Sequence, residues 1–99
     1  MKKFSKILIV LLLLVSNAHA DDLQEGLKAL ERGDYKTAFE KWQRLAREGN
    51  SIAQFNLGLM YDKGDGVRQS FPKAVKWYRK AAKQENAGAQ FNLGLMYKE

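Results

Sequence analysis

The apolar positions between residues 52 and 61 fall on two separate faces when the segment is wound as a helix at about 100° per residue. The two faces are formed by Ala53, Leu57, Met60 and Tyr61, and by Ile52, Phe55 and Leu59. A helix with two apolar faces needs neighbours on two sides, so we expect a partner helix on one side and an adjacent unit on the other. Gly58 lies inside this helix, where glycine costs about 1 kcal/mol relative to alanine. Close packing against another helix would offset that cost.

The same periodicity predicts helices over residues 23–32 and 35–47 before this segment, and over residues 72–83 and 87 to the end after it. The buried face of the 72–83 helix is predicted to consist of Ala74, Trp77, Tyr78, Ala81 and Ala82. Its outer side is predicted to carry Lys73, Lys76, Arg79, Lys80 and Lys83. The glycine-rich polar stretch before it reads as a loop. No strand pattern competes, so the fold class is all-α.

The helical segments repeat with a period of 36 residues. The nonapeptide AQFNLGLMY occupies residues 53–61 and again residues 89–97. The same distance separates Asp34 from Ser70, Tyr35 from Phe71, Ala38 from Ala74, Trp42 from Tyr78, Ala46 from Ala82 and Asn50 from Asn86. A period of this length is the mark of stacked supersecondary units that bury a continuous core between neighbours.

Three motifs in these units resemble those of a known family. They are A-x-x-x-L-G-x-M-Y over residues 53–61, G-x-G-V over 64–67, and A-x-x-W-Y-x-x-A-A over 74–82. Together they resemble the Sel-one-like repeat (SLR), a longer-looped relative of the tetratricopeptide repeat. The resemblance assigns one SLR repeat to residues 51–86, the first helix of a truncated further repeat to 87–99, and a tetratricopeptide-like hairpin to 21–50.

The resemblance implies a right-handed α-solenoid of helix-turn-helix repeats, with two hairpins plus one unpaired C-terminal helix. It also implies a module that binds other proteins or peptides, of a kind that is common among exported bacterial proteins. The chain departs from the family pattern in two ways. Glu85 stands where glycine is usual, so we expect Asn86 to take the left-handed conformation instead. The last helix exposes Phe91, Leu95 and Met96 without an intrachain partner, which predicts marginal stability or self-association through this helix.

Residues 1–20 have the three parts of a secretory signal peptide. Lys2, Lys3 and Lys6 precede an apolar run over residues 7–15, and Ala18-His19-Ala20 supplies small residues at a cleavage site. The run is shorter than the roughly 20 residues of a membrane-spanning helix. We therefore expect cleavage after Ala20, no membrane span afterwards, and a periplasmic or secreted protein.

Composition narrows the chemistry that is open to the chain. The formal net charge is +6, and it falls to +3 without residues 1–20, with positive and negative residues interspersed. A clustered basic stripe is not apparent, so no nucleic-acid partner is expected. The sequence contains no cysteine, and its single histidine is His19. We therefore expect no metal site and no cofactor, and no catalysis that depends on a thiol or an imidazole.

Two local patterns admit a chemical interpretation beside a structural one. Ser70 and Lys73 fit S-x-x-K, the acylation motif of penicillin-recognising enzymes, but the partner motifs S-D-N and K-T-G are absent. Because Ser70 aligns with Asp34, a helix N-cap is the favoured interpretation, and a cell-wall or β-lactam hydrolase is the alternative. The stretch DKGDG at 62–66 lacks the ligand order of a calcium loop and is interpreted as a turn.

The favoured function is a non-catalytic interaction module. Four amides lie between the apolar faces of the repeated helices, and a regular ladder of them could bind an extended peptide backbone: Gln54, Asn56, Gln90 and Asn92. A solvated surface remains the alternative for these side chains. Trp42, Trp77 and Tyr78 are interpreted as core residues rather than as groove residues. A further alternative is that the chain is a truncated remnant of a longer SLR protein.

Overall fold

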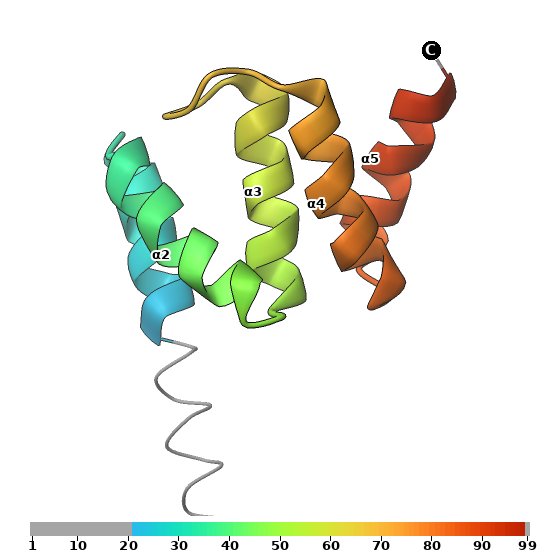
Figure 1. The fold of residues 1–99 in the computed structure, drawn as a ribbon. Coiled ribbons are helices and arrows are strands. Elements are labelled where there is room, and N and C mark those ends of the chain that lie inside the picture. The colour runs from blue at the N-terminus through green and yellow to red at the C-terminus, as the bar shows by residue number, and fades with distance from the viewer. Residues whose placement is uncertain (1–20, 99) are drawn as a thin grey trace, which may run out of the picture.

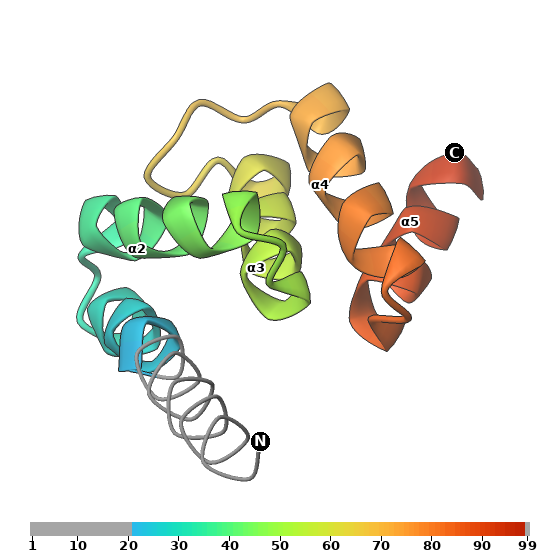
Figure 2. The same cartoon turned by 60° about the horizontal axis from the view of Figure 1, so that its bottom comes forward.

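The computed structural model describes residues 21–98, which form five helices and, within that range, no strand. A helix over residues 21–31 is followed by α2 (Tyr35–Arg47), α3 (Ser51–Lys63), α4 (Phe71–Lys83) and α5 (Ala87–Lys98). Each of α2, α3 and α4 packs against the next helix in the chain, so the helices form a row (Figures 1 and 2). The predicted all-α helical solenoid is confirmed, whereas the predicted signal peptide lies outside the described residues.

Four of the helices begin with the same kind of cap. In each case a side-chain oxygen accepts a hydrogen bond from the backbone N–H three residues later, which satisfies one of the unpaired donors of the first turn. The bonds join Asp34 to Thr37 at 3.2 Å, Asn50 to Ala53 at 2.9 Å, Ser70 to Lys73 at 3.3 Å and Asn86 to Ala89 at 2.9 Å. The caps recur with the 36-residue period, and the predicted capping role of Ser70 is confirmed.

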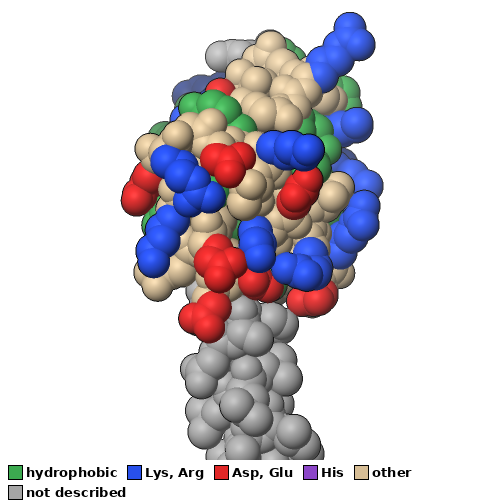
Figure 3. Space-filling model, turned by 90° about the vertical axis from the view of Figure 1, so that its left-hand side faces the viewer, with side chains coloured by type: hydrophobic (Ala, Val, Ile, Leu, Met, Phe, Trp, Pro, Cys, Tyr) green, Lys and Arg blue, Asp and Glu red, His purple; other side chains and the backbone are tan. Residues whose placement is uncertain are grey.

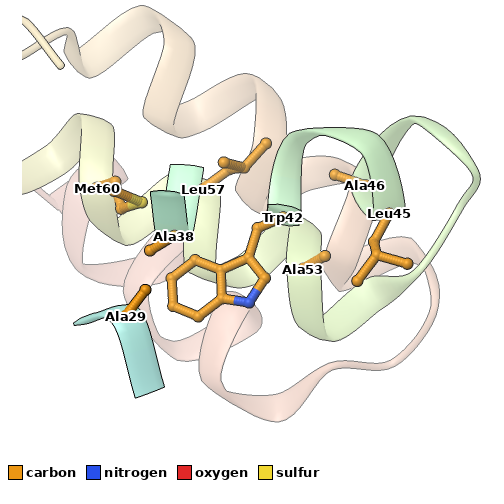
Figure 4. Close-up of a cluster of buried hydrophobic side chains, with 8 residues drawn as sticks. All are labelled: Ala29, Ala38, Trp42, Leu45, Ala46, Ala53, Leu57 and Met60. Carbon is orange, nitrogen blue, oxygen red and sulfur yellow. The ribbon is translucent and has the colours of Figure 1, made fainter. Parts of the chain in front are cut away.

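The first hydrophobic core joins the 21–31 helix, α2 and α3 around the indole ring of Trp42 (Figure 4). Trp42 is 2% exposed, and its Nε1–H donates a hydrogen bond to the Leu23 carbonyl at 3.4 Å. The other buried members are small or aliphatic: Ala29, Ala38, Leu45, Ala46, Ala53, Leu57 and Met60. The alanines let the helices approach closely, and the indole fills the space that remains between them.

The second core joins α3, α4 and α5 around the fully buried ring of Tyr78. Its other buried residues are Ala74, Ala81 and Ala89, and half-buried side chains pack around them: Phe55, Leu59, Tyr61, Ala82, Leu93 and Met96. Helix α3 therefore gives Leu57 to the first core and Phe55 to the second. The predicted two-faced character of this helix is confirmed.

Several side chains depart from their predicted positions. Ile52 is 52% exposed and lines a surface groove rather than a core. Tyr61 belongs to the second core, although its ring also meets that of Phe39 edge-on at 5.8 Å. Trp77 is half-buried against the first core. Met96 was expected to be uncovered but packs against the second core, because α5 turns the face that contains Leu93 and Met96 towards α4.

In each core the aromatic ring lies over a glycine of the neighbouring helix. A Cβ built on Gly58 would overlap the ring atoms Cδ1 and Cε1 of Tyr78, and a Cβ on Gly26 would overlap the indole of Trp42. The predicted close packing at Gly58 is confirmed, and its partner is a ring rather than a backbone. Gly94 occupies the same place in the second copy of the nonapeptide, and a Cβ there would meet nothing within 4 Å.

Helix α4 ends in a turn that forces a glutamate into the left-handed region. Glu85 has φ 65°, whereas the matching residues of the earlier turns are glycines, Gly33 with φ 80° and Gly49 with φ 100°. The Glu85 and Asn86 amides donate to the carbonyls of Ala82 at 2.9 Å and Ala81 at 3.2 Å, which is the Schellman pattern. The expectation that Asn86 would adopt this conformation is wrong, because Asn86 is already required as the cap of α5.

The two glycines of the repeated nonapeptide give a matched test of the ring-over-glycine contact. Gly58→Ala should destabilise the fold by about 2 kcal/mol, because the new methyl group must displace the Tyr78 ring. Gly94→Ala should stabilise it by up to about 1 kcal/mol, since alanine is the better helix former and the site is open. Urea unfolding followed by circular dichroism measures both, and equal effects at the two sites would contradict the packing described above.

The left-handed glutamate gives a second matched pair. Glu85→Gly should stabilise the protein by about 1 kcal/mol, because glycine avoids the steric cost of this conformation. The reverse change, Gly49→Glu, should destabilise it by about 1–2 kcal/mol, since nothing but the backbone conformation opposes the new side chain there. Thermal unfolding at fixed pH measures both. A destabilised Glu85→Gly variant would show that the glutamate side chain outweighs the strain.

Candidate functional site

The first helices of the successive units lie on a common side of the molecule. Helix α3 contacts α5 directly, in addition to its contacts with α2 and α4. Surface grooves lie between neighbouring first helices, on the side of the molecule that the second helices do not cover. We call this side, formed by residues 21–31, α3 and α5, the inner face.

One groove lies between α3 and α5 and has a volume of about 410 Å³. It is lined by three apolar side chains, Leu59, Leu95 and Met96, and by three polar ones, Asp62, Lys63 and Asn92. A second groove of about 440 Å³ lies between the 21–31 helix and α3. It is lined by Leu23, Gln24, Leu27, Ile52 and Asn56.

A smaller pocket of about 70 Å³ lies beside α3 and also reaches Leu30, Trp42 and Asp65. It shares Asn56 with the second groove, and it shares Leu59 and Lys63 with the first. The three spaces are therefore neighbours along α3, and we call them together the track of the inner face. Apolar side chains along this track remain partly open to solvent, with Leu27 46%, Ile52 52% and Leu95 49% exposed.

The track carries an amide at the same place in each unit. The amides are Gln24, Asn56 and Asn92, and they stand two residues before Gly26, Gly58 and Gly94, respectively. The structure places Asn56 and Asn92, two of the four predicted amides, at the track and adds Gln24. Sequence reasoning missed Gln24, although aligning Gly26 with Gly58 would have found it.

The other two predicted amides are engaged within the fold. Gln54 is 4% exposed, its Nε2 donates to the Ala46 carbonyl at 3.1 Å, and its Oε1 accepts from Gln84 Nε2 at 3.0 Å. The side chain of Gln90 repeats the first of these bonds, donating to the Ala82 carbonyl at 3.2 Å. Gln54 therefore belongs to the interior and not to an open ladder, because its amide joins α3 to the end of α2 and, through Gln84, to the end of α4.

Three hydrogen-bonded polar side chains, Tyr78, Asp62 and Asn92, form a cluster at the groove between α3 and α5. The hydroxyl of Tyr78 donates to Asp62 Oδ2 at 3.3 Å and accepts from Asn92 Nδ2 at 3.4 Å. Burial, together with the nearby Asp62 carboxylate, raises the pKa of Tyr78 to about 12. Tyr78 is therefore a neutral donor at physiological pH, and its hydroxyl orients the Asn92 side chain.

The proposed acylation pair is arranged as a helix start. Ser70 Oγ accepts the Lys73 amide hydrogen, and Lys73 Nζ lies over the Tyr61 ring at 5.4 Å from its centroid. The lysine ammonium is thus held by an aromatic ring rather than by the serine hydroxyl. Within residues 21–98, no three histidine, cysteine or carboxylate side chains gather as a metal site would require.

Comparison with known proteins assigns the chain to a family. The family model of the Sel1 repeat matches residues 51–86 and 87–99. The chain is a Sel1-like repeat protein. The solved structures of a Sel1 repeat protein from Oxalobacter formigenes and of c5321, a protective antigen of uropathogenic Escherichia coli strains with an SLR fold, superpose on it with TM-scores of 0.72 and 0.77. Their sequence identities to it are 36% and 30%, over 79% and 83% of this chain.

The relatives of this Sel1-like repeat protein are much longer than the chain itself. It is 40% identical over 50 residues to the "DAP3-binding cell death enhancer 1" of Rattus norvegicus, which is 50% of this chain and 10% of that protein. It covers 34% and 18% of the two solved structures. Sel1 repeats are generally protein-interaction modules. No helix in residues 21–98 has the length and apolar character needed to cross a membrane.

Proposed function

We propose that this Sel1-like repeat protein binds an extended peptide segment of another protein along the track on its inner face, without catalysis. The observation that carries this proposal is the row of neighbouring grooves on either side of α3, with an amide at the equivalent position of each unit. An extended peptide presents backbone N–H and C=O groups at regular intervals. Asn and Gln side chains both donate and accept, so Gln24, Asn56 and Asn92 could pair with such a backbone.

The grooves on either side of α3 would receive apolar side chains of the peptide. Their most exposed leucine and isoleucine side chains are about half exposed, so covering the exposed part of each with such a ligand is worth about 1 kcal/mol. Asp62 and Lys63 in the groove between α3 and α5 add one charge of each sign, which would influence orientation more than affinity. The neighbouring Tyr78 hydroxyl holds Asn92, so part of the site is organised before binding.

We also propose that the protein acts outside the cytoplasm, in the periplasm or after secretion. The support is the pattern of residues 1–20, in which three lysines, an apolar run and an Ala-His-Ala site follow one another.

Self-association through α5 remains a second use of the exposed apolar surface, where Phe91 is 67% exposed.

A peptide library displayed on phage and selected against residues 21–99 tests the binding proposal. Ile52→Arg and Leu95→Arg should each weaken the selected peptides by about tenfold or more, because each removes an apolar contact and inserts a charge into a groove. Phe71→Arg is the matched control, since Phe71 is 56% exposed and lies outside both grooves of the inner face. Equal losses in all three variants, or no peptide selected, would contradict the proposal.

Export is tested by the intact mass of the protein recovered from the extracytoplasmic fraction of the source cell. The measured mass should correspond to a chain that begins at Asp21, because the signal peptidase cleaves after small residues such as Ala20. Replacing Ala18 and Ala20 by bulky residues should block cleavage and leave the full-length mass. Accumulation of the uncleaved wild-type protein in the cytosol would show that residues 1–20 have another role.

A further inference from the structure

Charge is unevenly distributed along the described chain, in contrast to the interspersed pattern expected from composition. Residues 21–61 contain six Lys or Arg and seven Asp or Glu, a net charge of −1, whereas residues 62–98 contain eight and three, a net charge of +5. On the side of the molecule formed by the 21–31 helix and α2, both signs lie side by side (Figure 3). There Lys41 pairs with Asp22 and Glu25, and Arg44 pairs with Asp22.

Most of the excess positive charge lies on one side of α4. This helix contains five basic residues and no acidic residue. At about 100° per residue the five fall within about a third of the circumference, opposite the buried Ala74, Tyr78 and Ala81. Four of them follow an i, i+3, i+7, i+10 spacing and are all exposed, and we call them the basic stripe: Lys73, Lys76, Lys80 and Lys83. The stripe is about 15 Å long at 1.5 Å per residue.

Aromatic rings, rather than carboxylates, lie beneath most of these cations. Lys76 and Lys80 both lie over the Trp77 ring, at 5.8 and 5.2 Å from its centroid, and Lys73 lies over Tyr61 at 5.4 Å. Arg79, beside the stripe, lies over Tyr97 at 5.5 Å and donates to its hydroxyl at 2.6 Å. A ring attracts a cation through its quadrupole and carries no net charge. The cations are therefore positioned without being neutralised.

We propose that the basic stripe of α4 is a second interaction surface, which binds an acidic helical segment of a partner protein. A helix with carboxylates at the same i, i+3, i+7, i+10 spacing presents them along one line, so each can face a lysine of the stripe when the two helices lie side by side. Such a segment needs about three helical turns to match the 15 Å length. The surface is separate from the inner-face track, so the two sites could be occupied together.

Two other anionic partners fit the surface less well. A membrane-binding helix inserts apolar side chains beside its cations, whereas the apolar side of α4 is already buried in the second core. A long nucleic acid would extend beyond α4, and the neighbouring first hairpin, with its net charge of −1, offers it no continuation of the basic surface. A short acidic segment matches the length of the stripe and does not need positive charge on the first hairpin.

The test uses a synthetic alanine- and glutamine-based helical peptide with four glutamates at the stripe spacing, and the protein comprising residues 21–99. Binding is followed by anisotropy of the labelled peptide and by tryptophan fluorescence. Trp42 is 2% exposed, so a change on binding should come from Trp77 and should disappear in Trp77→Phe while the anisotropy signal persists. Affinity should fall with added salt, as expected for exposed ion pairs.

Lys76→Glu/Lys80→Glu should weaken binding by about tenfold or more, whereas the matched control Lys28→Glu/Lys36→Glu, which reverses two exposed lysines of the first hairpin, should not. Circular dichroism confirms that each variant is folded. Equal effects of the two double variants would overturn the proposal, as would equal binding of a peptide whose glutamates are spread around the helix. Tighter binding to anionic phosphatidylglycerol vesicles or to a DNA oligonucleotide than to the peptide would also overturn it.

Discussion

The packing of one aromatic ring over one glycine in each hairpin is the constraint on which the rest of the structure depends. Trp42 covers Gly26, and Tyr78 covers Gly58, so closely that neither glycine has room for a Cβ atom. Each ring needs small neighbours to come this close, and alanines provide them in both cores. The contact sets the distance between paired helices, and thereby the distance between the first helices that form the inner face. The grooves of the proposed binding track follow from that spacing.

The same ring serves both stability and the candidate site. Tyr78 fills the second core, and its buried hydroxyl joins Asp62 to Asn92, two residues that line the groove between α3 and α5. A buried hydroxyl needs hydrogen-bond partners, and two residues that line the groove supply them to Tyr78. This couples the position of Asn92 to the packing of α4 against α3. Trp42 uses its indole N–H differently, bonding the Leu23 carbonyl within the first hairpin.

The two faces of the solenoid have different chemistry for a structural reason. First helices such as α3 are packed on both sides, so what remains of their surface is narrow and holds apolar side chains and amides. Helix α4 uses one side for the second core and leaves the opposite side free for charge. A module built this way can offer an apolar track on one face and a charged stripe on another, without either surface interfering with the packing of the repeats.

The sequence alone determined the helices, their 36-residue repetition, the two-faced packing of α3 and the capping role of Ser70, because periodicity and cap chemistry are local properties. It also pointed to Asn56 and Asn92 on the inner face. Only the tertiary structure decided that the Gln54 side chain bonds within the interior, that Glu85 rather than Asn86 adopts the left-handed conformation, and that Met96 packs against the second core. The two identical nonapeptides show why. Gly58 and Gly94 have the same neighbours in sequence, yet only Gly58 lies beneath a ring. The environment of a residue is set by the helix that packs against it, which the local sequence does not specify.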